Sequence, residues 1–251
     1  GSRELINSYI GSGMMDSQFD FNVYDDAVAT FAKPEVSFTN LNASLLESLD
    51  YYGYHNLMGY ISGNQDRARF ISYAGGSLKF DENAKLAGWT RDIEVGDPVG
   101  YKKLCMLNAF NMTIPGVPTI YYGDEFGSPG GNDPDNRRLM KFSGLNSYEE
   151  KTLAITKKVV NIRKNNLALT YGDFKPLVVD QDIFAFARGY FSSRVIVMFN
   201  KSEEPKEIKF VLPVEYASRE YNVSFGSKIN QNGNAISVVV PANSFEILIA
   251  K

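Results

Sequence analysis

The hydrophobic pattern of the chain changes near Gly172, and this change limits the folds that the chain can adopt. Up to about Asn166, strand-like and helix-like segments alternate, whereas closely spaced runs of β-branched and aromatic residues follow Gly172. Alternating strands and helices favour parallel β/α units, and closely spaced short strands favour an antiparallel sandwich. We therefore predict an α/β part over residues 3–168 and an all-β Greek-key sandwich over residues 169–251.

Apolar periodicity predicts three strands and three helices in the first part. The expected strands are 19–23, 60–64 and 119–122, and the expected helices are 42–52, 100–112 and 147–164. Ser147 followed by Glu150 has the spacing of a capping box at the start of the last helix. A complete β/α barrel has eight units and needs about 250 residues. The first part is therefore either a small α/β domain or a piece of a barrel.

The second part contains five runs that favour strands. They are residues 184–187, 194–199, 208–212, 236–240 and 245–249. The sequence Gln231-Asn-Gly-Asn234 predicts a tight turn between two strands.

Composition excludes several classes of partner. The 251 residues include 26 basic and 29 acidic side chains, a formal net charge of −3, so neither nucleic acid nor an anionic membrane is expected. No apolar run approaches the length of a membrane-spanning helix. The single cysteine, Cys105, cannot form an internal disulfide, and no Cys/His spacing suggests a metal or another cofactor in this chain.

Two segments place polar side chains directly after predicted strands. One is Ile114-Pro-Gly-Val-Pro-Thr-Ile-Tyr-Tyr-Gly-Asp-Glu-Phe-Gly127 with Gly130-Gly-Asn-Asp-Pro-Asp-Asn-Arg-Arg138, and the other is Ile61-Ser-Gly-Asn-Gln-Asp-Arg-Ala-Arg-Phe70. Folds with parallel strands place their sites in loops of this kind. Composition alone favours a surface loop held by local Asp–Arg pairs for the first segment and a strand-terminating Asx turn for the second.

These segments resemble the ends of the eighth and seventh barrel strands in the α-amylase family of glycoside hydrolases (neopullulanase/amylase-like). The family patterns are G-x-P-x-I-Y-Y-G-x-E running into G-G-N-D-P-x-N-R, and N-H-D followed by Arg. The resemblance implies the last three β/α units of a TIM-type (β/α)8 barrel, followed by the family's C-terminal β-domain. It also implies a parent enzyme that cleaves α-glucosidic linkages of starch-derived glucans and maltooligosaccharides with retention.

The resemblance assigns roles to particular residues. Asp66 corresponds to the carboxylate that stabilises the oxocarbenium-like transition state. Asn64, Gln65, Asp133 and Arg137 are expected to bind substrate, although a structural Asp133–Arg137 ion pair is an equal alternative. Gln65 departs from the histidine that is usual in the family.

The other two catalytic carboxylates of the family have no counterpart. The family's nucleophilic Asp follows an Arg, and its acid/base Glu follows a Gly; neither pattern occurs, and Glu4 lacks the glycine. We therefore expect the chain to start just after the catalytic Glu and to be inactive alone. Two uncovered strand edges would favour self-association of such a truncated barrel.

Several residues carry weaker expectations. We expect structural roles for Asp20 and His55, and loop support from Tyr121, Tyr122 and Glu125. Trp89 is expected either to stack on a glucose ring or to anchor the core. The acidic stretches 81–82 and 92–97 fit solvated loops better than a calcium loop, and calcium would belong to the full-length protein.

Two alternatives to the enzyme reading stay open. One is a non-catalytic amylase-family relative that serves as a carbohydrate-binding or interaction subunit, and the other is a small carbohydrate-binding module. The residues do not decide the compartment, while the resemblance to starch-degrading bacterial enzymes favours the periplasm or the exterior.

Overall fold

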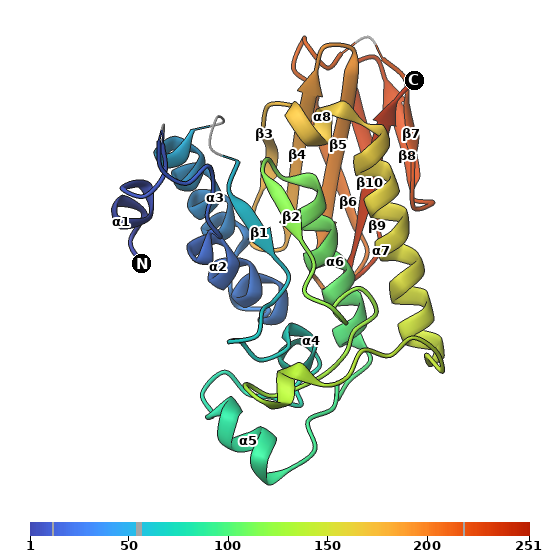
Figure 1. Cartoon of the computed structure of the whole chain (residues 1–251). Helices are drawn as coiled ribbons and strands as arrows, with labels where there is room; N and C mark the ends of the chain where they lie inside the picture. The colour runs from blue at the N-terminus through green and yellow to red at the C-terminus, as the bar shows by residue number, and fades with distance from the viewer. Residues whose placement is uncertain (12, 54–56, 218) are drawn as a thin grey trace.

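The computed structural model describes residues 1–11, 13–53, 57–217 and 219–251, so His55 lies outside the described residues. A mixed, mainly helical part is followed by antiparallel sheets (Figure 1). The first part contains α1 (Arg3–Asn7), α2 (Phe21–Ala32), α3 (Phe38–Tyr52), β1 (Gly59–Ile61), α4 (Phe70–Ala74), α5 (Ala84–Thr90), α6 (Val99–Thr113), β2 (Val117–Thr119), the 3-10 helix η1 (Asp135–Arg137), α7 (Ser147–Asn165) and α8 (Leu167–Tyr171). The second contains β3 (Lys175–Val179), β4 (Ile183–Tyr190), β5 (Ser193–Asn200), β6 (Lys206–Val211), β7 (Tyr221–Val223), β8 (Lys228–Asn232), β9 (Ala235–Val240) and β10 (Ser244–Ala250).

The strands β1 and β2 are parallel, with Gly59 opposite Val117 and Ile61 opposite Thr119. The predicted strands 60–64 and 119–122 are displaced: β1 contains only Tyr60 and Ile61 of the first, and β2 begins at Val117 and shares only Thr119 with the second. Beyond Thr119 the chain enters a turn, in which the Asp124 amide donates to the Tyr121 carbonyl at 3.0 Å.

The predicted strand 19–23 is wrong beyond its first residue. Phe19 forms a single parallel bridge with Gly59. Asp20 then accepts hydrogen bonds from the amides of Asn22 and Val23 at 3.1 Å each, and this cap starts α2 at Phe21. The expected structural role of Asp20 is thus that of a helix cap.

The three predicted helices are present; α3 and α6 begin earlier than expected, and α7 begins at Ser147 as expected. Residues 42–52 and 100–112 lie within α3 and α6. The capping box of α7 forms one residue earlier than predicted. The side chain of Asn146 accepts from the amides of Tyr148 and Glu149 at 2.9 and 3.0 Å, and Glu149 accepts from the Asn146 amide at 2.7 Å.

The antiparallel part forms two sheets, with strand orders β3-β4-β5-β10-β7 and β6-β9-β8. All five predicted strands are confirmed, and Gly233, at φ 62°, makes the predicted turn between β8 and β9. The strands β3, β7 and β8 were not predicted.

The central strands β4 and β5 of the larger sheet are buried on both faces. Phe184 and Phe186 of β4 pack with the helices, where the ring centroids of Phe38 and Phe184 lie 5.6 Å apart, whereas Ala185 and Ala187 face the smaller sheet. Buried aromatic residues of the helices and the sheet form one continuous cluster: Phe31, Phe38, Phe110, Phe174, Phe184, Phe186, Phe199 and Phe245. This shared core holds the β-domain firmly against the helices.

A buried cation ties the same two parts together. The Lys201 ammonium, after β5, donates to the carbonyls of Lys33, Pro34 and Val36 beyond the end of α2. Burial lowers the pKa of Lys201.

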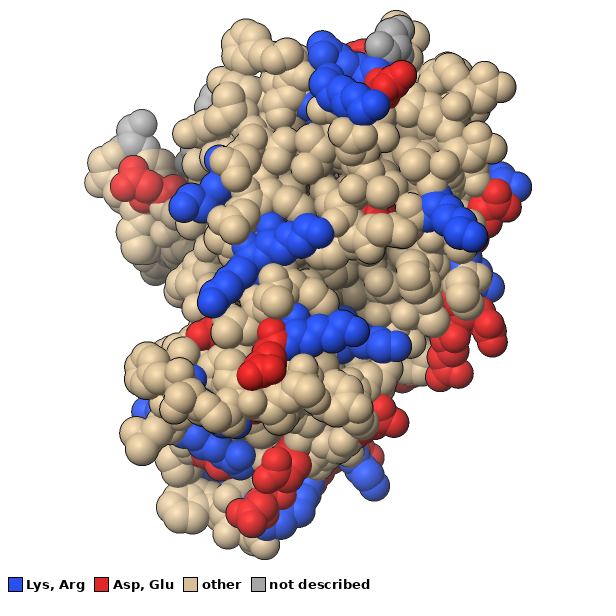
Figure 2. All heavy atoms as spheres, turned by 90° about the vertical axis from the view of Figure 1, so that its right-hand side faces the viewer, with Lys and Arg blue, Asp and Glu red and all other residues tan. Residues whose placement is uncertain are grey.

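The surface carries charges of both signs. In Figure 2, Lys and Arg side chains and Asp and Glu side chains both occur across one face, separated by larger uncharged areas. None of the helices in the described residues is long and apolar enough to cross a membrane.

Candidate functional site

The loops that follow β1 and β2 meet at a buried ion pair. Arg69 Nη1 lies 2.9 Å from Asp124 Oδ1, and the two side chains are 1% and 2% exposed. The Arg69 guanidinium also donates to the carbonyls of Tyr122 and Asn136, at 2.7 and 3.0 Å. A single buried cation therefore fixes both strand-end loops relative to each other.

Burial and hydrogen bonding have opposite effects on the pKa of Asp124 in this pair. Burial raises the pKa of the Asp124 carboxyl, while Arg69 and a 2.6 Å hydrogen bond from the Ser62 hydroxyl act in the opposite direction. The Arg69 guanidinium lies 4.3 Å from the Tyr121 ring centre and 5.0 Å from that of Tyr122, which adds cation–π attraction. These contacts fit the expected loop-supporting role of the two tyrosines.

Glu125 also contacts the backbone of its loop, which fits its expected loop-supporting role. Its carboxylate accepts a hydrogen bond from the Gly123 amide at 2.6 Å. Gly123 has φ 91°, a conformation that favours glycine, so the turn after β2 needs both residues.

The five predicted site residues lie together in the two strand-end loops. We call this set, Asn64, Gln65, Asp66, Asp133 and Arg137, the strand-end cluster. Arg137 lies at its centre: its Nε is 3.1 Å from Asp133 Oδ1 and its Nη2 is 3.7 Å from Asp66 Oδ1. Its Nε also donates to the Gln65 carbonyl at 3.2 Å.

Short-range contacts orient Asp66. Its amide donates to Asn64 Oδ1 at 2.9 Å, and the Gln65 amide nitrogen donates to Asp66 Oδ2 at 3.0 Å. Buried Asn136 donates to the carbonyls of Asn64 and Arg67 at 3.2 and 2.7 Å, which holds this turn from below. The Asp66 side chain is nevertheless 68% exposed, so a ligand can reach it.

The Asp133–Arg137 ion pair expected from the structural alternative is present, but both side chains stay partly exposed, at 36% and 46%. An ion pair and a ligand contact are therefore compatible in this cluster. Lys85 of α5 approaches the other oxygen of Asp133 at 3.6 Å.

The helix α5 carries Trp89 beside this region. Trp89 is 69% exposed, so the expectation that it anchors the core is wrong. In the acidic stretch 81–82, Glu82 pairs with Arg91 at 2.8 Å. Within the described ranges, no group of three or more His, Cys, Asp or Glu side chains could hold a metal ion.

Arg69 and Asp124 are not among the residues that the sequence predicts for the site. Both stand in the two quoted segments, in the loops that follow the predicted strands, and opposite charges in two neighbouring strand-end loops were the available signal. A cavity of about 600 Å³ lies elsewhere, between α6, α7 and the β-domain, and shares no residue with the strand-end cluster. Concavity alone therefore does not identify the cluster; the strand ends do.

No protein-family model matches the chain. A cyclomaltodextrinase of Thermoanaerobacter pseudethanolicus is 29% identical over 209 residues, which are 82% of this chain and 32% of that protein. An amylopullulanase of Thermoanaerobacter thermohydrosulfuricus is 34% identical over 165 residues, 61% of this chain and 10% of that protein.

Solved structures share the fold. An α-amylase from Geobacillus thermoleovorans complexed with acarbose has a TM-score of 0.79 at 21% identity, over 100% of this chain and 51% of that one. AmyP in complex with maltotriose has a TM-score of 0.81 at 15% identity, over 100% of this chain and 54% of that one. The chain thus spans about a third of the cyclomaltodextrinase and about half of each solved structure.

Proposed function

Because the chain is homologous to the α-amylase family of glycoside hydrolases over most of its length, we propose that it is the C-terminal portion of a retaining α-glucan hydrolase. In this proposal β1 and β2 are the seventh and eighth strands of a (β/α)8 barrel, and the bridge at Phe19 marks the sixth. The parallel pairing of β1 and β2 and the antiparallel sheets that follow them support it.

The proposed substrate is a starch-derived α-glucan or maltooligosaccharide, bound at the strand-end cluster. The observation that carries this proposal is that Arg137 reaches both Asp66 and Asp133, which come from two separate strand-end loops. Carboxylates and a guanidinium can together accept from and donate to neighbouring sugar hydroxyls. Asp66 is proposed to bind these hydroxyls more strongly as positive charge develops on the sugar ring.

Gln65 favours a second candidate, a non-catalytic relative that binds glucan as an interaction subunit. An amide can donate a hydrogen bond to a hydroxyl but cannot become charged as histidine can. Here the Gln65 amide also holds Asp66 Oδ2 at 3.0 Å. Binding of glucan would support both candidates, and only turnover by the longer parent polypeptide would separate them.

Calorimetric titration of the 251-residue chain with maltoheptaose tests the proposed site. We expect measurable binding that Asp66→Asn weakens about tenfold, because hydrogen bonds to a charged group contribute more than those to a neutral one. Asp50→Asn, an exposed carboxylate on α3, is the matched control and should bind as the unaltered chain does. No binding to the unaltered chain, or equal loss in both variants, would contradict the proposed site.

A further inference from the structure

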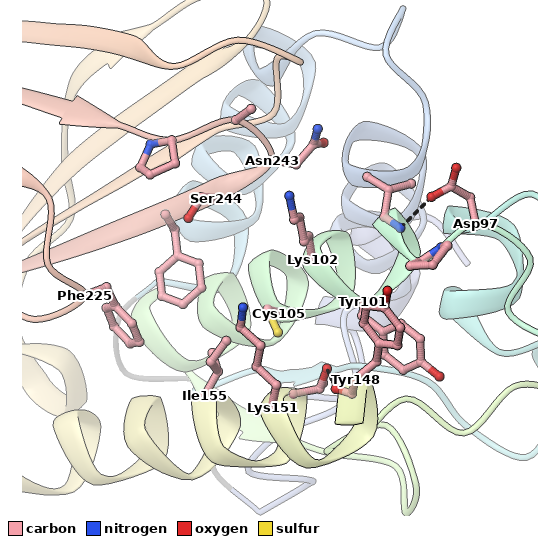
Figure 3. A pocket seen from close by; sticks show the side chains of 16 residues that line it. Asp97, Tyr101, Lys102, Cys105, Tyr148, Lys151, Ile155, Phe225, Asn243 and Ser244 are labelled. Atoms are coloured by element: carbon pink, nitrogen blue, oxygen red, sulfur yellow. Dashed lines mark hydrogen bonds between the residues drawn. The ribbon is translucent and has the colours of Figure 1, made fainter. Parts of the chain in front are cut away.

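The cavity between the helices and the β-domain has the features of a second ligand site. Its volume is about 600 Å³, within the range of small-molecule sites, and we call it the interlayer cavity. One wall consists of α6 and α7, and the opposite wall consists of the loops before β8 and β10 (Figure 3). Each wall therefore belongs to an element that the shared core holds in place.

Aromatic and aliphatic side chains line much of this space. The rings of Tyr101 and Tyr148 stack at 5.5 Å with an angle of 14° between their planes. On the β-domain side Phe225 and Phe245 pack with ring centres 4.7 Å apart, and Ile155 of α7 also lines the cavity. Such walls favour a flat, apolar body in the ligand.

The wall formed by Phe225 is fixed by a buried carboxylate. Glu246 of β10 accepts hydrogen bonds from the amides of Ser224, Phe225 and Ser227 at 2.8, 2.7 and 2.9 Å. Glu246 is fully buried. The cavity is thus built on one side by a loop whose backbone is held at three points, which favours a preformed site.

Two ammonium groups extend into the same space. Lys102 of α6 and Lys151 of α7 line the cavity, and Figure 3 shows both side chains extending toward the loop that carries Asn243. Neither lysine forms a hydrogen bond or an ion pair with any of the residues that the structure describes. The one carboxylate in the lining, Asp97, accepts from the Val99 amide at 2.7 Å at the start of α6.

We infer that the interlayer cavity binds a small organic anion with an aromatic body, its carboxylate or sulfonate group held between Lys102 and Lys151. The two ammoniums supply charge-assisted hydrogen bonds to the anion, and the stacked tyrosines and Phe225 contact the rings. This inference goes beyond the proposed function and does not depend on it, because the cavity shares no residue with the strand-end cluster.

Fluorescence titration with anilinonaphthalene sulfonate tests the site, with uncharged phenylnaphthylamine as the comparison ligand. We expect saturable binding of the sulfonate, weakened about two- to fivefold by Lys102→Met and by Lys151→Met. Binding of the uncharged amine should be equal in all variants. Lys157→Met is the matched control, because Lys157 is an exposed lysine of α7 outside the cavity lining.

Amide shifts of the isotopically labelled chain provide a readout that does not depend on the variants. The sulfonate should shift the amide signals of Thr152, Phe225 and their neighbours in the lining. Equal affinity for the sulfonate in the chain and both lysine variants would overturn the inference. Shifts confined to residues outside the cavity, or displacement of the sulfonate by neutral maltotriose, would overturn it as well.

Discussion

At the scale of single residues, the strand-end loops depend on one buried ion pair. Removing one member of such a pair leaves an uncompensated buried charge, which costs about 3 kcal/mol or more. We therefore expect Asp124→Asn to lower the free energy of unfolding by about 3 kcal/mol in urea denaturation. Asp50→Asn should change it by less than about 0.5 kcal/mol, because its side chain is exposed. Equal free energies of unfolding for the two variants would contradict the stabilising role of the Arg69–Asp124 ion pair.

Burial of the single thiol, Cys105, should slow its reaction with thiol reagents. Cys105 is 7% exposed, and burial raises the pKa of its thiol from 9.0 to about 12. Because the native pKa lies above the unfolded one, stability that is present below pH 9 is lost as pH rises toward 12. At pH 8, uncharged iodoacetamide, which lacks the aromatic and anionic groups that the interlayer cavity would bind, should alkylate the thiol of the native chain about a thousandfold more slowly than that of the urea-unfolded chain. Comparable rates would show that the thiol is accessible, and Cys105→Ser corrects for background.

The site was predictable only in part, and the reason differs from residue to residue. The five cluster residues were found through the two motif segments, since glycines and prolines keep those segments recognisable. Arg69 and Asp124 were missed because a buried ion pair joins residues 55 positions apart, and only the parallel pairing of β1 with β2 brings them together.

At the scale of helices and strands, side-chain pattern predicted the interiors of elements better than their ends. The strands β4 and β5 were evident because β-branched and aromatic residues fill them. The strand β7 has three residues and β8 is mostly polar, so neither carries a strong hydrophobic signal. Phe21 was assigned to a strand because the cap made by Asp20 is a local hydrogen-bonding event that hydrophobic periodicity does not encode.

The start of α7 allows a direct test of one such end. Asn146 accepts two amide hydrogen bonds there, whereas Ser147 is the first helical residue. Asn146→Ala should lower the free energy of unfolding by about 1 kcal/mol, and Ser147→Ala should leave it nearly unchanged. Urea denaturation of both variants measures the difference. A larger loss of unfolding free energy in Ser147→Ala would indicate instead that Ser147 caps the helix, as the sequence predicts.

At the scale of the whole molecule, the chemistry of the proposed parent needs more than this chain contributes to the cluster. Retaining hydrolysis requires a nucleophile and an acid/base whose carboxyl groups lie about 5–5.5 Å apart. Asp66 is proposed for neither role. We therefore expect the 251-residue polypeptide to release no reducing sugar from soluble starch above background. Turnover that Asp66→Ala abolishes would show that the catalytic carboxylates have been misassigned.

The exposed edge of the two-stranded parallel sheet favours self-association of the chain. One side of β1 is partly covered, because Gly59 exchanges hydrogen bonds with Gln18 and Asp20. On β2, Val117 is 47% exposed, and apolar side chains elsewhere in the first part, such as Met14 at 58%, are also open to solvent. Exposed strand edges and apolar surface favour pairing between copies. Sedimentation velocity at increasing concentration should therefore detect dimers or larger species.

A charge on the exposed edge should reverse this association. Val117→Lys places an ammonium beside the edge of β2, so it should shift the sedimentation distribution toward monomer. Val239→Lys, on the central strand β9 of the smaller sheet, is the control, since Val239 is similarly exposed at 40% but has strands on both sides. If the unaltered chain sediments as a monomer at every concentration, the edge of β2 is not a pairing surface. If both variants dissociate equally, added charge rather than the edge governs the association.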